Sequence, residues 1–420
     1  METSSTASSR AAARISRLRP FDGRRILLGV TGGIASYKTV MLARLLTQAG
    51  ALVDVVMTPA AQEFVGAITF EAVTGRRTYT DIFGAGNALD HIRLAREAEL
   101  FVVAPATADF LARAAHGHAN DLLSASLLAN TSPVLLIPAM NDRMWANAQT
   151  AHNVASLRDR GYTVVDPEDG QLAVGEGSGP GRMPEPETIL AHIARNLDSD
   201  KVLAGRRVVV TAGATREAVD PVRFLSNHSS GRMGIAIAEA AWRRGADVTL
   251  VVAHVDVPVG VGPRVIHAES VDEMAAAVAS VLPHADALVM AAAPADFRPA
   301  HAADRKISKR QDAPGMAIEL APTTDILMAT LPLRPPGAII VGFALETGNA
   351  LSKGAAKLEE KSLDMIVVND ALEEGAGFGV DTNRVTILTP HGPPEELPLM
   401  SKNAVADAIL DRVGQLLSGR

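Results

Sequence analysis

The stretch RILLGVTGGIASYK, residues 25–38, joins an apolar run to a Gly-Gly turn and to the start of an apolar-periodic segment. Amphipathic segments separate most of the further short apolar runs, which lie at 52–57, 100–104, 134–137 and 162–165. Continuous apolar strands between helices indicate a parallel sheet that is covered on both faces. Residues 24–195 are therefore predicted to form an α/β domain with a doubly wound, Rossmann-like sheet.

The same alternation restarts after a polar stretch, so residues 196–205 are predicted to be a linker and 206–420 a second doubly wound α/β domain. Its strands are expected at 207–211, 248–252, 287–291, 338–343, 365–369 and 385–388. Helices are expected at 230–244 and 404–417. The halves share no visible repeated motif, which favours the fusion of two different proteins over a duplication.

Residues 1–23 are rich in Ser, Ala and Arg and poor in acidic residues, so they are predicted to be a disordered tail. An organellar transit peptide has a similar composition and is the alternative.

The composition of the 420 residues excludes several classes of protein and site. The formal net charge of -7 argues against a nucleic-acid scaffold, and no apolar run reaches the roughly 18 residues of a membrane-spanning helix. Cysteine is absent, which excludes disulfides, thiolate metal sites and cysteine nucleophiles. We expect a cytoplasmic protein without a nucleic-acid or membrane partner.

Several small, polar segments of the first half follow apolar runs, where ligands bind in open α/β sheets. The turn 31–38 could bring backbone N–H groups and a helix N-terminus to a phosphate, although such turns are common without ligands. The three other segments are APATADF (104–110), GHANDL (117–122) and PAMNDRMW (138–145), and DHIRLA (90–95) enters only through the resemblance that follows. In combination, residues 24–190 resemble the homo-oligomeric flavin-containing cysteine decarboxylases, specifically the phosphopantothenoylcysteine decarboxylase branch.

This resemblance implies that His91 is the catalytic base and that Asn141 holds the substrate carboxylate. It also implies contacts to FMN from Gly32, Ser36, Thr58 and Thr107. The alternatives are that His91 is one of 11 ordinary histidines and that Asn141 caps the following helix.

One position departs from the family pattern. The flap of the family reads LACGE, whereas residues 172–176 read LAVGE, so Val174 replaces the cysteine that acts as the acid in the final reduction. Valine cannot donate a proton. We therefore expect a first domain that binds FMN but has an impaired last step, and a rescue by Glu176 or Ser178 is the alternative.

The second half contains TAGATREAVDPVRFLSNHSSGRMG, residues 211–234. Its loop offers the guanidinium of Arg223, the amide of Asn227 and free helix N–H groups to an anion, although a serine N-cap alone would be commoner. Residues 204–420 resemble the phosphopantothenate–cysteine ligases. By that resemblance, Arg223 and Asn227 stabilise an acyl-nucleotide.

The resemblance also implies a nucleotide site for CTP. Lys306, Lys357 and Lys361 would bind the triphosphate, and Phe343 would pack near the base. The last two lysines share a helix face, and such like charges favour an anionic partner. No metal ligand is indicated, and Mg2+ would be held through the nucleotide phosphates. The remaining residues expected at the nucleotide are Met290, Ala291, Ala292, Asp296, Thr324, Asp325, Ile326 and Leu327.

Together these features predict a bifunctional enzyme of coenzyme A biosynthesis. It would ligate 4'-phosphopantothenate to L-cysteine with CTP, through an acyl-cytidylate, and then decarboxylate the product to 4'-phosphopantetheine with FMN. One alternative is a ligase with a vestigial flavin-binding oligomerisation domain, and another is a regulatory flavin-binding protein without chemistry. The resemblance implies a homo-oligomer, trimer-based through the flavin domain and dimeric through the ligase domain.

Overall fold

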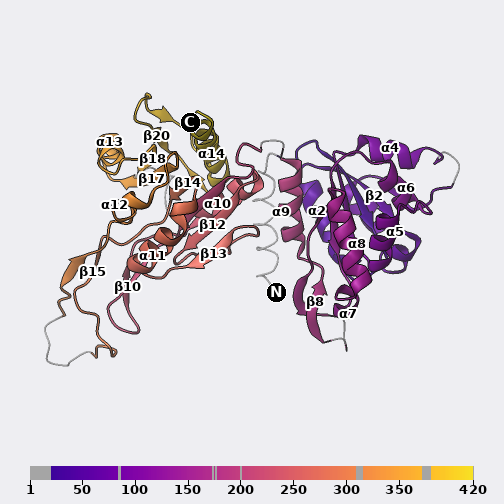
Figure 1. The fold of residues 1–420 in the computed structure, drawn as a ribbon, viewed down its shortest axis with the longest axis horizontal. Helices are drawn as coiled ribbons and strands as arrows, with labels where there is room; N and C mark the ends of the chain where they lie inside the picture. The colour runs from indigo at the N-terminus through magenta and orange to yellow at the C-terminus, as the bar shows by residue number, and fades with distance from the viewer. Residues whose placement is uncertain are drawn as a thin grey trace. The chain divides into compact units, whose positions relative to one another are not determined.

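The computed structural model describes residues 20–83, 87–172, 175, 177–198, 201–308, 316–370 and 380–419. The chain forms two compact units, residues 1–199 and 200–420. In Figure 1 the first unit runs from indigo to magenta and the second from red to yellow.

The first unit contains a six-stranded sheet. Its strands are β1 Arg25–Val30, β2 Leu52–Met57, β3 Thr78–Tyr79, β4 Leu100–Ala106, β5 Val134–Pro138 and β6 Thr163–Val164. The strand order is β3-β2-β1-β4-β5-β6, and every neighbouring pair is parallel. This is the doubly wound order, with its topological switch between β1 and β4. It confirms the predicted fold, whereas the short β3 was not predicted.

Helices cover both faces of this sheet (Figure 1). One face packs against α2 Ser36–Gln48, α3 Ala67–Thr74 and α9 Pro186–Leu197. The other packs against α4 Asp90–Glu97, α5 Ala108–His116, α6 Leu122–Ala129 and α8 Ala148–Asp159. Alternate residues of β1 enter the two layers, Ile26 and Leu28 on the first face and Leu27 on the second. Burial on both faces explains why the strand is a continuous apolar run.

The second unit repeats this order in an eight-stranded sheet. Its strands are β9 Arg207–Ala212, β12 Asp247–Val252, β13 Arg264–His267, β14 Ala287–Met290, β17 Ile339–Glu346, β18 Met365–Asp370, β20 Thr386–Leu388 and β21 Glu395–Glu396. The parallel part reads β13-β12-β9-β14-β17-β18, and β20 and β21 extend it antiparallel. The switch point lies between β9 and β14. The Rossmann-like prediction is again confirmed.

Two helical layers enclose this second sheet as well. One contains α10 Arg232–Arg243 and α14 Lys402–Ser418. The other contains α11 Val271–Val281, α12 Ile326–Ala329 and α13 Ala350–Glu360.

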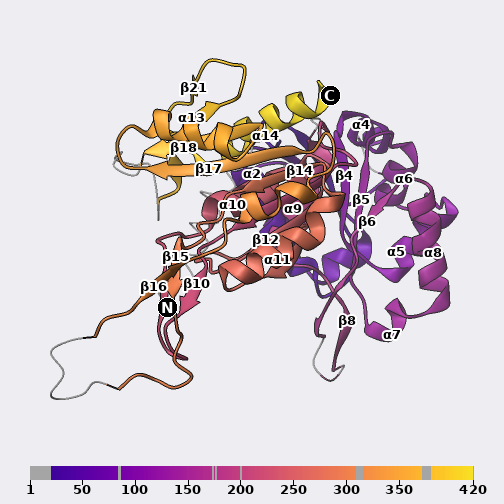
Figure 2. The ribbon, with the colours of Figure 1, turned by 60° about the vertical axis from the view of Figure 1, so that its left-hand side comes forward.

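Four short antiparallel pairs lie outside the sheets, and none of them was predicted. They are β7 Glu168–Gln171 with β8 Ser178–Arg182, β10 Arg216–Ala218 with β11 Phe224–Ser226, β15 Phe297–Pro299 with β16 Leu320–Pro322, and β19 Thr382–Asn383 with β22 Met400–Ser401. Both views place β10 beside β15, away from the large sheet (Figures 1 and 2).

The ends of the two units differ from the boundaries expected from sequence. The predicted tail 1–23 lies mostly outside the described residues, but Phe21 is fully buried in the first core. The predicted linker 196–205 includes the end of α9 at Leu197 and the buried Leu203, which packs in the second core. Single apolar residues at such borders carry no periodic signal.

Gly234 allows α10 to lie close to β9, and its replacement by alanine should destabilise the second unit. An added Cβ would lie 2.7 Å from the Thr211 carbonyl oxygen and 2.6 Å from the Ala212 Cβ. We expect Gly234→Ala to cost about 1–3 kcal/mol, as overpacking does. Calorimetry measures the loss of unfolding free energy, and hydrogen exchange in α10 assigns the transition to the second unit. Gly419→Ala, which meets nothing nearer than 3.5 Å, is the control, and equal midpoints for both variants would contradict the packing argument.

Candidate functional site

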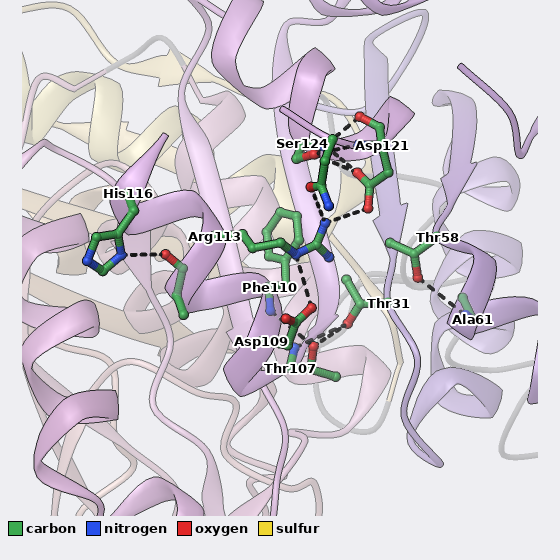
Figure 3. Close-up of polar contacts among 12 residues, drawn as sticks. Thr31, Thr58, Ala61, Thr107, Asp109, Phe110, Arg113, His116, Asp121 and Ser124 are labelled. Carbon is green, nitrogen blue, oxygen red and sulfur yellow. Dashed lines mark hydrogen bonds and ion pairs between the residues drawn. The ribbon is translucent and has the colours of Figure 1, made fainter. Parts of the chain in front are cut away.

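Thr31 joins the two strand ends at the switch point of the first sheet (Figure 3). It directly follows β1 and is 2% exposed. Its hydroxyl donates to the carbonyl oxygen of Pro105 at 2.7 Å and accepts from the backbone N–H of Thr107 at 3.1 Å. The turns after β1 and β4, which carry the predicted FMN contacts Gly32 and Thr107, therefore lie side by side. This is the position where ligands bind in doubly wound sheets.

The two turn glycines have different neighbours. A Cβ on Gly32 would lie 2.5 Å from the Cβ of Ala60, so the packing of the chain itself requires glycine there. A Cβ on Gly33 would meet nothing nearer than the Thr107 Cγ2, at 3.6 Å. Ser36 is fully buried and its hydroxyl donates to the Gly33 carbonyl oxygen at 2.7 Å, so in this structure it supports the turn. No side chain caps α2, but the N–H groups of Ser36 and Lys38 donate to the carbonyl oxygens of Gly33 and Ala35, each at 3.0 Å. A phosphate would therefore bind to other N–H groups of this turn.

Thr58 and Thr107 both cap the elements that follow them. The Thr58 hydroxyl accepts from the backbone N–H of Ala61, and the Thr107 hydroxyl accepts from that of Phe110, each at 3.3 Å. Both residues stand at carboxyl ends of strands, as predicted, and their contacts to FMN stay predictions.

His91 lies in the first turn of α4, beside Asp90. The His91 Nδ1 and the Asp90 Oδ2 are buried and have no hydrogen-bond partner among the described residues. The other oxygen of Asp90 accepts from Arg93 at 2.9 Å. An unpaired buried polar atom costs free energy. These two atoms are therefore candidates for hydrogen bonds to a bound ligand or to a second subunit. The predicted role of His91 as a base is compatible with this position.

Asn141 is the N-cap of a short helix, α7 Asp142–Trp145, and its Oδ1 accepts from the backbone N–H of Arg143 at 2.9 Å. The capping interpretation is thus correct, while its amide NH2 group donates to no other described residue. A Cβ on Gly181, in β8, would lie 2.2 Å from the carbonyl oxygen of Met140. The hairpin β7–β8 therefore packs directly on the segment of Asn141. Val174 falls between these two strands in sequence and, like Glu176, lies outside the described residues.

Two charged groups beside this site were not identified from the sequence. Lys38 is buried, and its ammonium donates to the carbonyl oxygen of Met183 at 2.7 Å and to Glu185 at 3.0 Å, which ties α2 to the end of β8. The available signal was a lysine on the helix face that it shares with Leu42 and Leu45, at the spacing i, i+4 and i+7. Figure 3 shows the second group, Arg113 between Asp109 and Asp121.

Asp121 gives the GHANDL segment a structural role, since it caps α6. Burial alone would raise the pKa of its carboxyl, but the N–H of Ser124 and the guanidinium of Arg113 hold that pKa below its ordinary value.

The switch point of the second sheet has the same construction. Thr211, in β9, is fully buried, and its hydroxyl accepts from the backbone N–H of Ala292 at 3.1 Å, just after β14. The amide of Asn227 donates to the carbonyl oxygen of Pro294 at 2.9 Å. The predicted anion loop and the predicted nucleotide segment, Met290, Ala291, Ala292 and the exposed Asp296, therefore meet at this point. Gly231 caps α10 without a side-chain hydrogen bond, so N–H groups of its first turn lie beside the same loop.

The helix lysines already have carboxylate partners in this structure. Lys357 pairs with Glu346 at 2.7 Å, and Lys361 pairs with Asp325 at 2.8 Å. The hydrogen bond from Lys357 is the largest effect that lowers the pKa of Glu346, whereas burial opposes it. Lys353 shares Glu346 with Lys357, at 3.0 Å. The argument that the like charges of Lys357 and Lys361 require an anion is weakened, because each of these two lysines already contacts a carboxylate.

The other predicted nucleotide residues lie on three separate segments of the second unit. Thr324 donates to Asp272 at 3.2 Å, and Asp325 caps α12, which begins with the buried Ile326 and Leu327. Phe343 is partly buried in β17 and packs against the second core. Lys306 is exposed, on the segment between β15 and β16. Their contacts to a nucleotide stay predictions.

Neither a metal cluster nor a membrane span is found in the described parts of the chain. No group of three or more His, Cys, Asp or Glu there could hold a metal ion. None of the helices within those ranges is both long and apolar enough to cross a bilayer.

Comparison with known proteins agrees with this division of the chain. Residues 15–198 match the family model described as flavoprotein, and residues 203–417 match that of the DNA/pantothenate metabolism flavoprotein C-terminal domain. A coenzyme A biosynthesis bifunctional protein CoaBC of Mycobacterium bovis is 46% identical over 413 residues, which are 94% of this chain and 97% of the relative. The protein of the same name from Vibrio cholerae is 44% identical over 390 residues, 92% of this chain and 97% of its own.

Solved structures cover the two halves separately. The C-terminal domain of a CoaBC protein is 35% identical, covers 52% of this chain and all of its own, and has a TM-score of 0.45. The FMN-dependent cysteine decarboxylase SpaF is 34% identical, covers 41% of this chain and 95% of its own, and has a TM-score of 0.35.

Fold and site thus define a flavoprotein domain followed by a pantothenate-metabolism domain, each with a candidate crevice at its own switch point. The chain belongs to the family of bifunctional coenzyme A biosynthesis proteins, which combine a decarboxylase and a ligase.

The two turn glycines give a test of the flavin site. Gly33→Ala should keep the fold, because its methyl group has room, but should lose bound FMN, because that methyl covers backbone that a phosphate approaches. Gly32→Ala should unfold more easily, because its methyl meets Ala60. Visible flavin absorbance of the purified proteins and their thermal unfolding measure the two effects. Full FMN content in a folded Gly33→Ala variant would show that the phosphate does not approach this turn.

Proposed function

We propose that the second domain joins 4'-phosphopantothenate to L-cysteine with CTP, and that the first domain acts on the product with FMN. The observation that carries the ligase proposal is the hydrogen bond from Asn227 to Pro294 at the switch point between β9 and β14. It supports a single crevice in which the anion loop faces the predicted nucleotide segment. The names of the bifunctional relatives, which match nearly the whole chain, support the pairing of the two activities.

The ligase reaction has two balanced steps. A carboxylate oxygen of 4'-phosphopantothenate attacks the α-phosphorus of CTP, and pyrophosphate leaves. The cysteine amine then attacks the acyl carbon of the acyl-cytidylate, CMP leaves, and the amine loses a proton.

Charged and polar residues would lower the barrier of both steps. Arg223 and Asn227 would hold the acyl-cytidylate, because a guanidinium fork and an amide suit its phosphate and carbonyl oxygens. Lys306, Lys357 and Lys361 would offset the charge of the departing pyrophosphate, together with Mg2+ bound through the phosphates. The remaining contacts to the nucleotide would come from Met290, Ala291, Ala292, Asp296, Thr324, Asp325, Ile326, Leu327 and Phe343.

In the first domain, Gly32, Ser36, Thr58 and Thr107 would hold FMN, which supplies reversible two-electron chemistry when bound. His91 would accept a proton from the substrate, and its unpaired Nδ1 is available for a contact. Asn141 would bind the carboxylate that leaves as CO2. Val174 supplies no proton at the flap position, so the last reduction would be slow or would use another group.

The second candidate function is a ligase whose first domain only binds FMN and holds the oligomer together, and Val174 is the observation that favours it. In both cases we propose a cytoplasmic homo-oligomer, with a trimer-based assembly through the first domain and a dimer through the second.

The products of the purified chain distinguish these functions. With 4'-phosphopantothenate, cysteine, CTP and Mg2+, we expect mass spectrometry to detect 4'-phosphopantothenoylcysteine and CMP, with little 4'-phosphopantetheine. Val174→Cys should increase 4'-phosphopantetheine, because it restores a proton donor, and Val174→Ser is the control for size. Absence of CMP would refute the ligase proposal. Rapid formation of 4'-phosphopantetheine by the unmodified chain would show that another group replaces the thiol.

A further inference from the structure

A buried carboxylate joins the loop of Arg223 to the segment of Lys306. Asp220 lies between β10 and β11 and is 3% exposed. Its Oδ1 accepts from the backbone N–H groups of Val222 at 2.8 Å and Arg223 at 2.9 Å. Its Oδ2 accepts from the backbone N–H of Ile307, the residue after Lys306, at 3.1 Å. One side chain therefore fixes the backbone next to two predicted cations of the ligase site.

A second contact supports the same junction. The backbone N–H of Ala303 donates to the carbonyl oxygen of Val219 at 3.0 Å, so hydrogen bonds hold the chain on both sides of Lys306. The side chains of Lys306 and Arg223 are themselves exposed. The junction thus orders the backbone and leaves both cationic heads accessible.

The charge of Asp220 suits this role. Burial alone would raise the pKa of its carboxyl, but three backbone N–H groups and the guanidinium of Arg223, 3.5 Å away, hold that pKa below its ordinary value. The group is therefore ionised at neutral pH, and hydrogen bonds to a charged acceptor are stronger than those to a neutral one.

We propose that Asp220 is a positioning residue of the ligase site, which presets Lys306 and Arg223 for one anionic substrate without touching that substrate. The inference rests on the proposed ligase function and deepens it. Both cations are carried on segments without regular structure, and the ordering of such segments during the reaction would cost conformational entropy. A carboxylate that orders both beforehand lowers this cost.

The competing interpretation is that Asp220 only closes its own turn. The hydrogen bonds to Val222 and Arg223 would suffice for that, whereas the one to Ile307 spans 87 positions of sequence. Asp220→Asn separates the two interpretations. The asparagine oxygen can still accept from Val222 and Arg223, but its NH2 group then faces the N–H of Ile307, donor against donor.

The first measurement is steady-state ligase kinetics of the full chain. For Asp220→Asn we expect kcat/KM for CTP to fall about tenfold, the effect of one lost hydrogen bond to a charged group, with an unchanged KM for cysteine. Glu217→Gln is the matched control. Glu217 is a buried carboxylate of the same hairpin that accepts from the N–H of Val271 at 2.9 Å, which glutamine can still do. It should leave both parameters unchanged.

The second measurement is a double-mutant cycle with Lys306→Ala. If Asp220 acts through Lys306, then Asp220→Asn should reduce kcat/KM less in the Lys306→Ala background than in the unmodified chain. An equal loss in both backgrounds would overturn the inference, since Asp220 would then act independently of Lys306. If Lys306→Ala alone has no effect, the role of Lys306 in the proposed function is wrong, which is a separate failure.

The third measurement applies even if Asp220→Asn does not fold. In the unmodified chain, hydrogen exchange by NMR should show a protected Ile307 amide beside faster amides of Lys306 and Ser308, which donate to no acceptor within the described ranges. Where the variant folds, protection at Ile307 should be lost. Equal exchange of all three amides in the unmodified chain would overturn the inference.

Discussion

The structure depends on a type of interaction that both domains contain, a buried threonine hydroxyl that joins the ends of two central strands. Thr31 binds Pro105 and Thr107 in the first sheet, and Thr211 binds Ala292 in the second. Parallel strands diverge at a topological switch point, because their connections leave in opposite directions, and a crevice opens there. The hydroxyl holds the two edges of that crevice at a fixed separation and satisfies backbone groups that would otherwise be unpaired. Both candidate sites are built around this constraint.

The three lysines of α13 and its C-cap all contact carboxylates, since Lys353 and Lys357 share Glu346 and Lys361 contacts Asp325. Lys357 and Lys361 each contact a carboxylate, but both pairs are partly exposed to solvent. Such ion pairs contribute little stability, so a polyphosphate could exchange with the carboxylates at small cost. The pairing therefore does not argue against a nucleotide site. The pairing with carboxylates also reduces the repulsion between the two lysines on one helix. The spacing of the lysines in the sequence did not indicate this structural role.

The sequence predicted the positions of the long strands, because burial on both faces leaves a continuous apolar run in each. It did not predict β3, β13, β21 or the four short antiparallel pairs, since two to five residues are too few for a period. The candidate site residues were inferred from motifs and from the family resemblance that the motifs carry, and Thr58, Thr107 and Ala292 do follow strand ends. Their contacts to ligands stay predictions. Lys38 and Asp220 were missed for a different reason. Their partners lie 145 and 87 positions away, and no local pattern can encode a contact of that range.

Several contacts of described residues hold the hairpin β7–β8, which carries Val174 where the family pattern has a cysteine. Gly181 lies against Met140, and Lys38 and Arg182 both contact Glu185, the N-cap residue of the helix α9 that follows β8. These contacts are made by described residues on either side of positions 173 and 174, so we expect β7 and β8 to stay packed beside Asn141 in variants of position 174. In the proposed function, Val174 leaves the final reduction without a proton donor, whereas binding and decarboxylation would depend on the groups beside Asn141. In that proposal the substitution would separate two steps that a cysteine would couple.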